Sequence, residues 1–292
     1  MLITTRLGRT VEVREDYTVD QNWEDFSAEE HDRWDRLYAR QGKILQGRAC
    51  KEFMDGLELL SLSDGGIPNF EKLSEKLMKA TGWQVVAVPD LVPDEVFFDH
   101  LANRRFPAGN FIRSEEQLDY LQEPDVFHDV YGHVPMLANP VFADYMAAYG
   151  KGGQRAAGRG VLPNLARLYW YTVEFGLIKT DEGMRIYGAG IVSSKSESIF
   201  CLEDDSPNRI HFDLERLMKT DYRIDDFQQT YWVIESFEEL LQATYQDFGP
   251  LYDRLEQAGK PIRPADILEG DTVYTNGTQE YADKGGRLAN AS

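Results

Sequence analysis

The chain has 292 residues and a formal net charge of −19, from 50 acidic and 31 basic side chains. Nucleic-acid backbones are bound by clusters of lysine and arginine, and the sequence has none, so no nucleic-acid partner is expected. No apolar run is long enough to span a membrane, and the first residues lack the apolar core of a signal peptide. The two cysteines have no metal-ligand spacing and fit a reducing compartment, so we expect a cytoplasmic protein.

The first half of the chain predicts helices with clear boundary signals. Ser27-Ala-Glu-Glu30 is a capping-box pattern, and apolar residues recur at helical spacing after it. Asn69 is a suitable N-cap for a helix that ends at Gly82. The expected elements are a helix after Ser27, helices at 44–60 and 69–82, and a short strand at 83–88.

The second half predicts further helices and one short strand. They are helices from 140 to about 150, at 162–179, 222–231 and 235–256, and a strand at 185–191. We therefore expect a mainly α fold, a single domain of packed helices with a few short β-strands, over residues 23–267. An N-terminal arm of residues 1–22 precedes it, and residues 268–292, polar and rich in glycine, form a flexible tail.

Two of the five histidines lie close together in the stretch from Glu123 to Pro135. On a continuous α-helix, residues five apart point roughly 140° away from each other, so His128 and His133 could not share a metal ion. Asp125 can cap a helix that ends at Gly132, and such a break would let both imidazoles turn toward one point. The alternative is two ordinary histidines, one at a helix end and one in a loop.

An isolated carboxylate lies downstream in an aromatic run. The helical neighbours of Glu174 are apolar or aromatic, and a buried carboxylate without a partner is costly. A metal ion would supply the partner, and so would an ion pair with Arg167. Two imidazoles and one carboxylate are the ligand set of non-haem ferrous oxygenases, whose remaining positions are open.

Three long motifs resemble the signatures of one family, the pterin-dependent aromatic amino acid hydroxylases, and are closest to its short bacterial phenylalanine 4-hydroxylases. They are Pro124-Asp-Val-Phe-His128-Asp-Val-Tyr-Gly-His133-Val-Pro135, Arg167-Leu-Tyr-Trp-Tyr-Thr-Val-Glu174-Phe-Gly and Tyr187-Gly-Ala-Gly-Ile-Val-Ser-Ser194. The motifs occur in the family's order and spacing, and the similarity runs from about Trp23 to Tyr252.

The resemblance implies a role for named residues. The implied Fe(II) ligands, and with them the catalytic centre, are His128, His133 and Glu174. The implied substrate-binding residues are Arg113 for the amino acid carboxylate, Pro124, Trp170 and Phe175 for the aromatic ring, and Ser193, which supports a histidine ligand and the amino acid end. From residue type alone, Arg113 would be a solvated charge. Trp170 and Phe175 would be core residues, and Ser193 would be a turn residue.

The resemblance also implies a site for tetrahydrobiopterin or a related tetrahydropterin. The matching positions are Leu91 and Val92 on a loop, Phe97 for ring stacking, Asp129 and Tyr169. Asp129 departs from the animal enzymes, which have Glu after the first histidine. From its spacing alone, Phe97 would be helix-face core.

The implied activity is hydroxylation of L-phenylalanine to L-tyrosine with Fe(II), O₂ as co-substrate and a tetrahydropterin. The same chemistry on tryptophan or tyrosine is the nearest alternative, and a zinc hydrolase or a non-catalytic amino acid binder are more distant ones. The chain shows no heptad pattern for the tetramerisation helix of the animal enzymes, so we expect a monomer whose partners are small molecules.

Overall fold

The computed structural model describes residues 1–5, 8–119 and 123–286 of the chain. Two compact units contain them. Unit 1 comprises residues 1–43 and 51–155, and unit 2 comprises residues 44–50 and 156–292.

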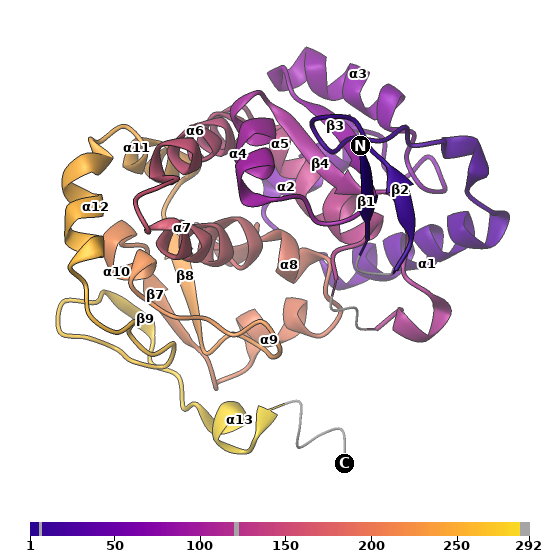
Figure 1. The fold of residues 1–292 in the computed structure, drawn as a ribbon. Coiled ribbons are helices and arrows are strands. Elements are labelled where there is room, and N and C mark those ends of the chain that lie inside the picture. Colours follow the sequence, from indigo (N-terminus) through magenta and orange to yellow (C-terminus); the bar gives the residue numbers. More distant parts are fainter. Residues whose placement is uncertain (6–7, 120–122, 287–292) are drawn as a thin grey trace. The chain divides into compact units, whose positions relative to one another are not determined.

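Unit 1 is mainly helical (Figure 1). Its α-helices are α1 (Ala28–Ile44), α2 (Lys51–Leu59), α3 (Phe70–Thr81), α4 (Asp94–Ala102), α5 (Val134–Leu137) and α6 (Pro140–Ala156). Short 3₁₀ turns lie at Trp23–Asp25 and Glu115–Gln117, and a π-helix lies at Phe127–His133. Two pairs of strands complete the unit, namely β1 (Leu2–Thr4) antiparallel to β2 (Thr10–Glu12), and β3 (Gln84–Val88) parallel to β4 (Arg105–Gly109).

The boundary signals of two predicted helices are confirmed. The Asn69 side chain accepts a hydrogen bond from the Lys72 backbone N–H at the start of α3, and Gly82 ends the helix in the left-handed conformation. At the start of α1 the Glu30 carboxylate accepts from the Ser27 backbone N–H at 2.8 Å, and the Ser27 hydroxyl accepts from the Glu30 N–H at 3.2 Å.

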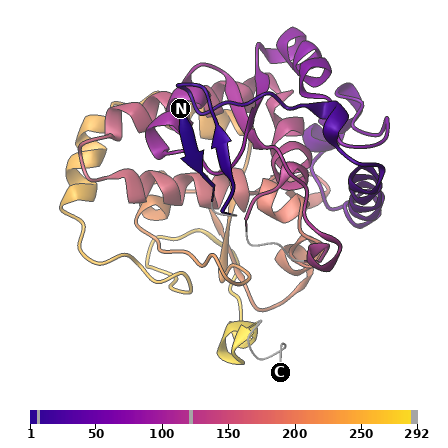
Figure 2. The ribbon, with the colours of Figure 1, turned by 45° about the vertical axis from the view of Figure 1, so that its right-hand side comes forward.

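The first 22 residues, predicted as an arm, pack against unit 1 where they are described. The β1–β2 hairpin is visible from two directions in Figures 1 and 2. Val13 is buried, Val19 forms an antiparallel bridge to Ala87 of β3, and Asp16 forms an ion pair with Arg105 at 2.6 Å.

Unit 2 is built on a mixed five-stranded sheet of order β6-β5-β8-β7-β9. The strands are β5 (Leu177–Thr180), β6 (Gly183–Ile186), β7 (Asn208–His211), β8 (Thr230–Ile234) and β9 (Val273–Thr275). The helices are α7 (Leu162–Tyr169), a π-helix (Trp170–Glu174), α8 (Ala189–Val192), α9 (Glu197–Glu203), α10 (Leu214–Met218), α11 (Phe237–Ala243), α12 (Phe248–Glu256) and α13 (Glu280–Asp283).

The sheet corrects the expectation of a mainly α fold, which holds in part. The segment predicted as a helix at 222–231 ends in β8, whose five residues are all buried at the centre of the sheet. The predicted helix at 162–179 ends at Glu174 and is followed by β5, and the predicted strand at 185–191 is the end of β6 followed by α8. Short apolar strands buried on both faces have no polar alternation, so their pattern is that of a buried helix.

The segment expected to be a flexible tail carries ordered structure as far as residue 286. Strand β9 pairs antiparallel with β7, and Asp271 forms a buried ion pair with Arg216 at 3.2 Å. The ring of Tyr281 packs against Phe200 and Phe227, with centroids 5.1 and 5.2 Å away. Residues 287–292 lie outside the described part.

Truncation after Leu268 is expected to destabilise the protein. It removes the edge strand and leaves the buried Arg216 guanidinium without its carboxylate, a loss that typically costs about 3–5 kcal/mol. We expect the midpoint of thermal unfolding to fall by roughly 10 °C. A control variant that ends after Gly286 keeps β9 and α13, and its midpoint should match that of the full chain; equal midpoints for all three proteins would contradict the prediction.

Candidate active site

The two histidines of the first motif face each other within a π-helix of unit 1. His128 and His133 both lie in Phe127–His133, and their Nε2 atoms are 3.2 Å apart. In a π-helix the hydrogen bonds join residues five apart, so side chains at i and i+5 lie one above the other. Two imidazole nitrogens this close fit adjacent positions on one metal ion, because zinc–imidazole bonds, for example, are about 2.0–2.1 Å long.

The expected helix break at Gly132 is wrong. The π-helix includes Gly132, and Gly132 is absent from the glycines with positive φ. The chain continues directly into α5 at Val134, and Pro135 is the second residue of that helix. The wider winding of the π-helix, rather than a bend at a glycine, brings the two imidazoles together.

A buried carboxylate joins this π-helix to the arginine predicted to bind substrate. Asp125 accepts a hydrogen bond from the His128 backbone N–H at 3.0 Å, as its predicted capping role requires. It also accepts from Arg113 Nε at 2.9 Å and Nη2 at 2.8 Å. Burial acts to raise the pKa of Asp125, but the Arg113 guanidinium holds this pKa below its ordinary value. Arg113 is therefore buried and oriented, in contrast to a solvated charge.

Replacement of Asp125 by Ala is expected to cost about 3–5 kcal/mol of unfolding free energy, because it leaves the Arg113 guanidinium buried without a partner. Urea unfolding measures this loss. The double variant Asp125→Leu/Arg113→Met removes both charges and should recover all but about 1 kcal/mol, the value of the lost helix cap. A loss below about 1 kcal/mol for Asp125→Ala would show that the pair contributes nothing to stability.

Asp129, predicted to contact the pterin, points into unit 1. Its side chain is buried, and Oδ2 accepts a hydrogen bond from the Gly109 backbone N–H at 2.7 Å, at the end of β4. Burial raises the pKa of Asp129 to about 6, while the imidazoles of His128 and His133 act in the opposite direction. Pro124 is partly buried beside the same strand end, with its carbonyl oxygen 3.5 Å from where a Cβ on Gly109 would lie.

The other pterin positions of unit 1 lie on or just before α4. Leu91 is 50% exposed and Val92 is partly exposed on the loop that precedes the helix. Phe97 is partly exposed, whereas its neighbour Phe98 is buried against Tyr149, with centroids 5.6 Å apart. Phe98 is thus the core residue of this pair, and Phe97 is only partly buried.

Glu174 is the last residue of the π-helix of unit 2 and is partly buried. Arg167, the alternative partner of Glu174, forms an ion pair with Asp221 at 3.8 Å. His128, His133 and Glu174 each offer one donor atom to a metal ion.

Two glycines of the third motif have a steric role that the sequence did not reveal. A Cβ on Gly188 would lie 2.4 Å from the Glu174 carbonyl oxygen. A Cβ on Gly190 would lie 2.9 Å from Cζ of Phe175 and 3.2 Å from Oε2 of Glu174. Only glycine lets α8 approach the end of the π-helix this closely.

The aromatic residues of the second motif meet within unit 2. The rings of Trp170 and Phe175 have centroids 4.7 Å apart, and the Phe175 N–H donates to the Trp170 carbonyl at 2.8 Å, an i→i−5 bond. Tyr169, the last residue of α7, is partly exposed. The Ser193 hydroxyl is buried and donates to the Ala189 carbonyl at 2.7 Å, so in this structure it caps α8.

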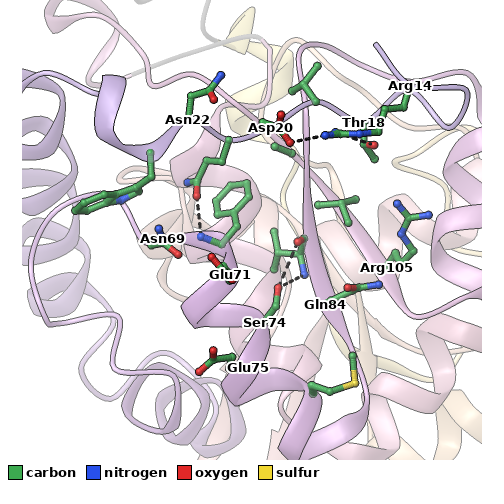
Figure 3. Close-up of a pocket in the computed structure, with 18 of the residues that line it drawn as sticks. Arg14, Thr18, Asp20, Asn22, Asn69, Glu71, Ser74, Glu75, Gln84 and Arg105 are labelled. Carbon is green, nitrogen blue, oxygen red and sulfur yellow. Dashed lines mark hydrogen bonds and ion pairs between the residues drawn. The ribbon is translucent and has the colours of Figure 1, made fainter.

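A separate cavity of about 670 Å³ lies in unit 1, beside α3 and β3 (Figure 3). Polar side chains in its lining form hydrogen bonds that stabilise the fold. Gln21 accepts from the Phe70 N–H at 2.7 Å, and the Ser74 hydroxyl accepts from the Val85 N–H at 2.9 Å at the edge of β3. None of the predicted site residues lines this cavity.

The chain matches a family described as "Biopterin-dependent aromatic amino acid hydroxylase" over residues 10–254. It belongs to this family. A phenylalanine-4-hydroxylase of Caulobacter vibrioides is 64% identical over 279 residues, which cover 96% of this chain and 95% of the relative. One of Chromobacterium violaceum is 60% identical and covers 92% of this chain and 90% of the relative.

Solved structures of the Chromobacterium violaceum phenylalanine hydroxylase share the fold. A structure with bound iron(III) and oxidised cofactor 7,8-dihydrobiopterin has a TM-score of 0.87 and 60% identity, and covers 90% of this chain and 95% of that one. A structure with bound iron and phenylalanine has a TM-score of 0.85 and 59% identity, and the match covers 89% of this chain and 94% of that one.

Sequence reasoning missed several residues that hold the site. Asp125 was predicted as a helix cap but not as the partner of Arg113, although its place three residues before His128 in an acidic-aromatic motif was a signal. Tyr222 and Gln228, which contact Trp170, lie in the segment wrongly predicted as a helix. No spacing rule links them to Trp170.

Proposed function

We propose that this protein hydroxylates L-phenylalanine to L-tyrosine with Fe(II), O₂ and tetrahydrobiopterin or a related tetrahydropterin. The observation that carries the proposal is the pair of Nε2 atoms 3.2 Å apart in the π-helix of a chain that belongs to the biopterin-dependent hydroxylases. The names of relatives at 60–64% identity support phenylalanine as substrate.

His128, His133 and Glu174 are the proposed iron ligands. Two neutral imidazoles and one carboxylate suit Fe(II) and leave coordination positions open. Iron and the pterin together supply the reductive activation of O₂, and the protein supplies binding, orientation and exclusion of water. Asp125 fixes the start of the helix that carries both histidines, and Gly188 and Gly190 leave room for Glu174.

Arg113 is the proposed partner of the substrate carboxylate. Asp125 holds Nε and Nη2 of its guanidinium, and Nη1 is not used by this ion pair. A guanidinium that is fixed before the substrate arrives loses little conformational freedom on binding, which favours its use for carboxylate recognition. Ser193 is proposed to support the amino acid end of the substrate or a histidine ligand.

Pro124, Trp170 and Phe175 are proposed to bind the aromatic ring of the substrate, and Leu91, Val92, Phe97, Asp129 and Tyr169 the pterin. The tilted ring pair of Trp170 and Phe175 supports the first assignment. The partial exposure of Phe97, next to the buried Phe98, supports the second, because a fully buried ring could not stack on a ligand.

Among the described residues, no helix is long and apolar enough to cross a membrane. A cytoplasmic location and a monomeric state remain predictions from the sequence.

The ligand assignment predicts that His128→Ala and Glu174→Ala lose bound iron and hydroxylase activity while they remain folded. His31→Ala is a matched control, because His31 is a partly buried histidine of unit 1, outside the proposed site, whose Nδ1 accepts from the Ile67 N–H. Iron content by metal analysis and far-UV circular dichroism are the measurements. Full iron occupancy in either ligand variant would remove that residue from the assignment.

The substrate assignment predicts that purified protein with Fe(II), O₂ and tetrahydrobiopterin converts phenylalanine to tyrosine. Chromatography of the products tests this, and kcat/KM for phenylalanine, tryptophan and tyrosine tests the preference. We expect phenylalanine to be preferred at least tenfold. A tenfold preference for tryptophan would instead favour the same chemistry on that amino acid, and turnover with zinc and without pterin would favour a hydrolase.

A further inference from the structure

Two aromatic rings and one hydrogen bond hold the indole of Trp170 within unit 2. Phe175 packs on one side at a centroid distance of 4.7 Å, and Tyr222 stacks with it at 4.6 Å and an interplanar angle of 23°. Nε1 donates a hydrogen bond to Oε1 of Gln228 at 3.0 Å. An indole has two side-chain torsions, so these three contacts define the plane and the reach of the ring.

Gln228 is itself fixed by its surroundings. It is only 2% exposed, and its Nε2 donates to the backbone carbonyl of Arg223 at 2.9 Å. Because both Nε2 bonds go to carbonyl oxygens, the second to Asp226 at 3.4 Å, the amide oxygen must face the indole. The Gln228 backbone N–H donates to the buried carboxylate of Glu197 at 3.3 Å.

The segment that supplies Tyr222 and Gln228 has no helix or strand of its own between α10 and β8, yet it is anchored at both ends. The hydroxyl of Tyr171 donates to the Asp221 carbonyl, and Tyr281 donates to the Asp226 carboxylate at 3.0 Å. The Glu197 carboxylate that holds Gln228 also accepts from the hydroxyl of Tyr231 in β8 at 2.8 Å. Through Glu197, hydrogen bonds therefore connect the segment to β8, the central strand of the sheet.

We propose that Gln228 is a positioning residue: by fixing the Trp170 indole, it sharpens the preference of the enzyme for phenylalanine over larger aromatic side chains. The inference rests on the proposed function, in which Trp170 binds the substrate ring. An apolar wall discriminates between aromatic rings by shape, and a wall whose plane is fixed by a buried hydrogen bond rejects a larger ring better than a mobile one.

Gln228→Leu removes the acceptor with little change in volume. We expect KM for phenylalanine to rise roughly three- to tenfold, with kcat within about twofold and iron content unchanged, as for loss of one hydrogen bond that orients a binding wall. The preference for phenylalanine over tryptophan in kcat/KM should fall by a similar factor. Gln229→Leu is the matched control, because the side chain of Gln229 contacts that of Gln279 in the C-terminal segment; its kinetics should equal those of the wild type.

A structural readout that does not depend on turnover uses the indole N–H signals in ¹H–¹⁵N NMR spectra of the zinc-loaded protein. The chain has five tryptophans, and Trp170→Phe identifies the signal of Trp170. Gln228→Leu should shift this signal upfield, and Gln229→Leu should leave it in place. In the Trp170→Phe background, Gln228→Leu should change KM by less than twofold, since the bond it removes no longer exists.

The results separate this inference from the proposed function. If the wild type makes no tyrosine, the proposed function is wrong. Suppose instead that the wild type is active, and that Gln228→Leu and the Gln229→Leu control have the same KM, the same amino acid preference and the same Trp170 indole signal. The inference is then overturned. Should Gln228→Leu fail to fold, Tyr222→Leu replaces it, because Tyr222 is only partly buried and stacks on the same indole; an unchanged amino acid preference in that variant would equally overturn the inference.

Discussion

The two short segments that carry the proposed iron ligands each depend on π-helical winding. In each, a pair of residues five apart comes into register: the imidazoles of His128 and His133 in unit 1, and the rings of Trp170 and Phe175 in unit 2. An α-helix would turn the members of each pair away from each other. A π-helix packs its backbone less favourably and is rare, so its presence in both ligand-bearing segments is best explained by the positions it gives to these side chains.

The cost of this winding is met by specific tertiary contacts. Asp125 binds the first turn of the histidine-bearing helix and the Arg113 guanidinium with one buried carboxylate. The end of the second π-helix is covered by α8, which can approach only because Gly188 and Gly190 lack side chains. The helix that carries both histidines and the predicted substrate arginine therefore share one support, Asp125, and a change at that residue affects both.

The sequence predicted the chemistry of the site better than its geometry. The order and spacing of three motifs were enough to name the family, and the caps of α1 and α3 followed from local rules. The ligand roles of His128, His133 and Glu174 stay predictions. The π-helices could not be predicted from the sequence, because no residue pattern specifies them. A helix break at Gly132 was a simpler explanation of how His128 and His133 could converge. Strand β8 was missed because all five of its residues are buried, and β5 because its buried Leu177 and Ile178 continue the apolar run of the preceding helix. Strand β9 was missed because three partly exposed residues at a sheet edge are too short a pattern to predict a strand.

The contacts of Trp170, the proposed wall of the substrate site, show why such contacts escape prediction. Its partner Phe175 is near in sequence and comes from the winding of the helix, whereas Tyr222 and Gln228 reach it only through the path of the chain after α10. That path is set by the buried Glu197 and by Tyr231 in β8, so the orientation of one indole depends on the register of the sheet. Because folding already restricts the ring, a substrate that packs on it loses less conformational entropy than on a mobile side chain.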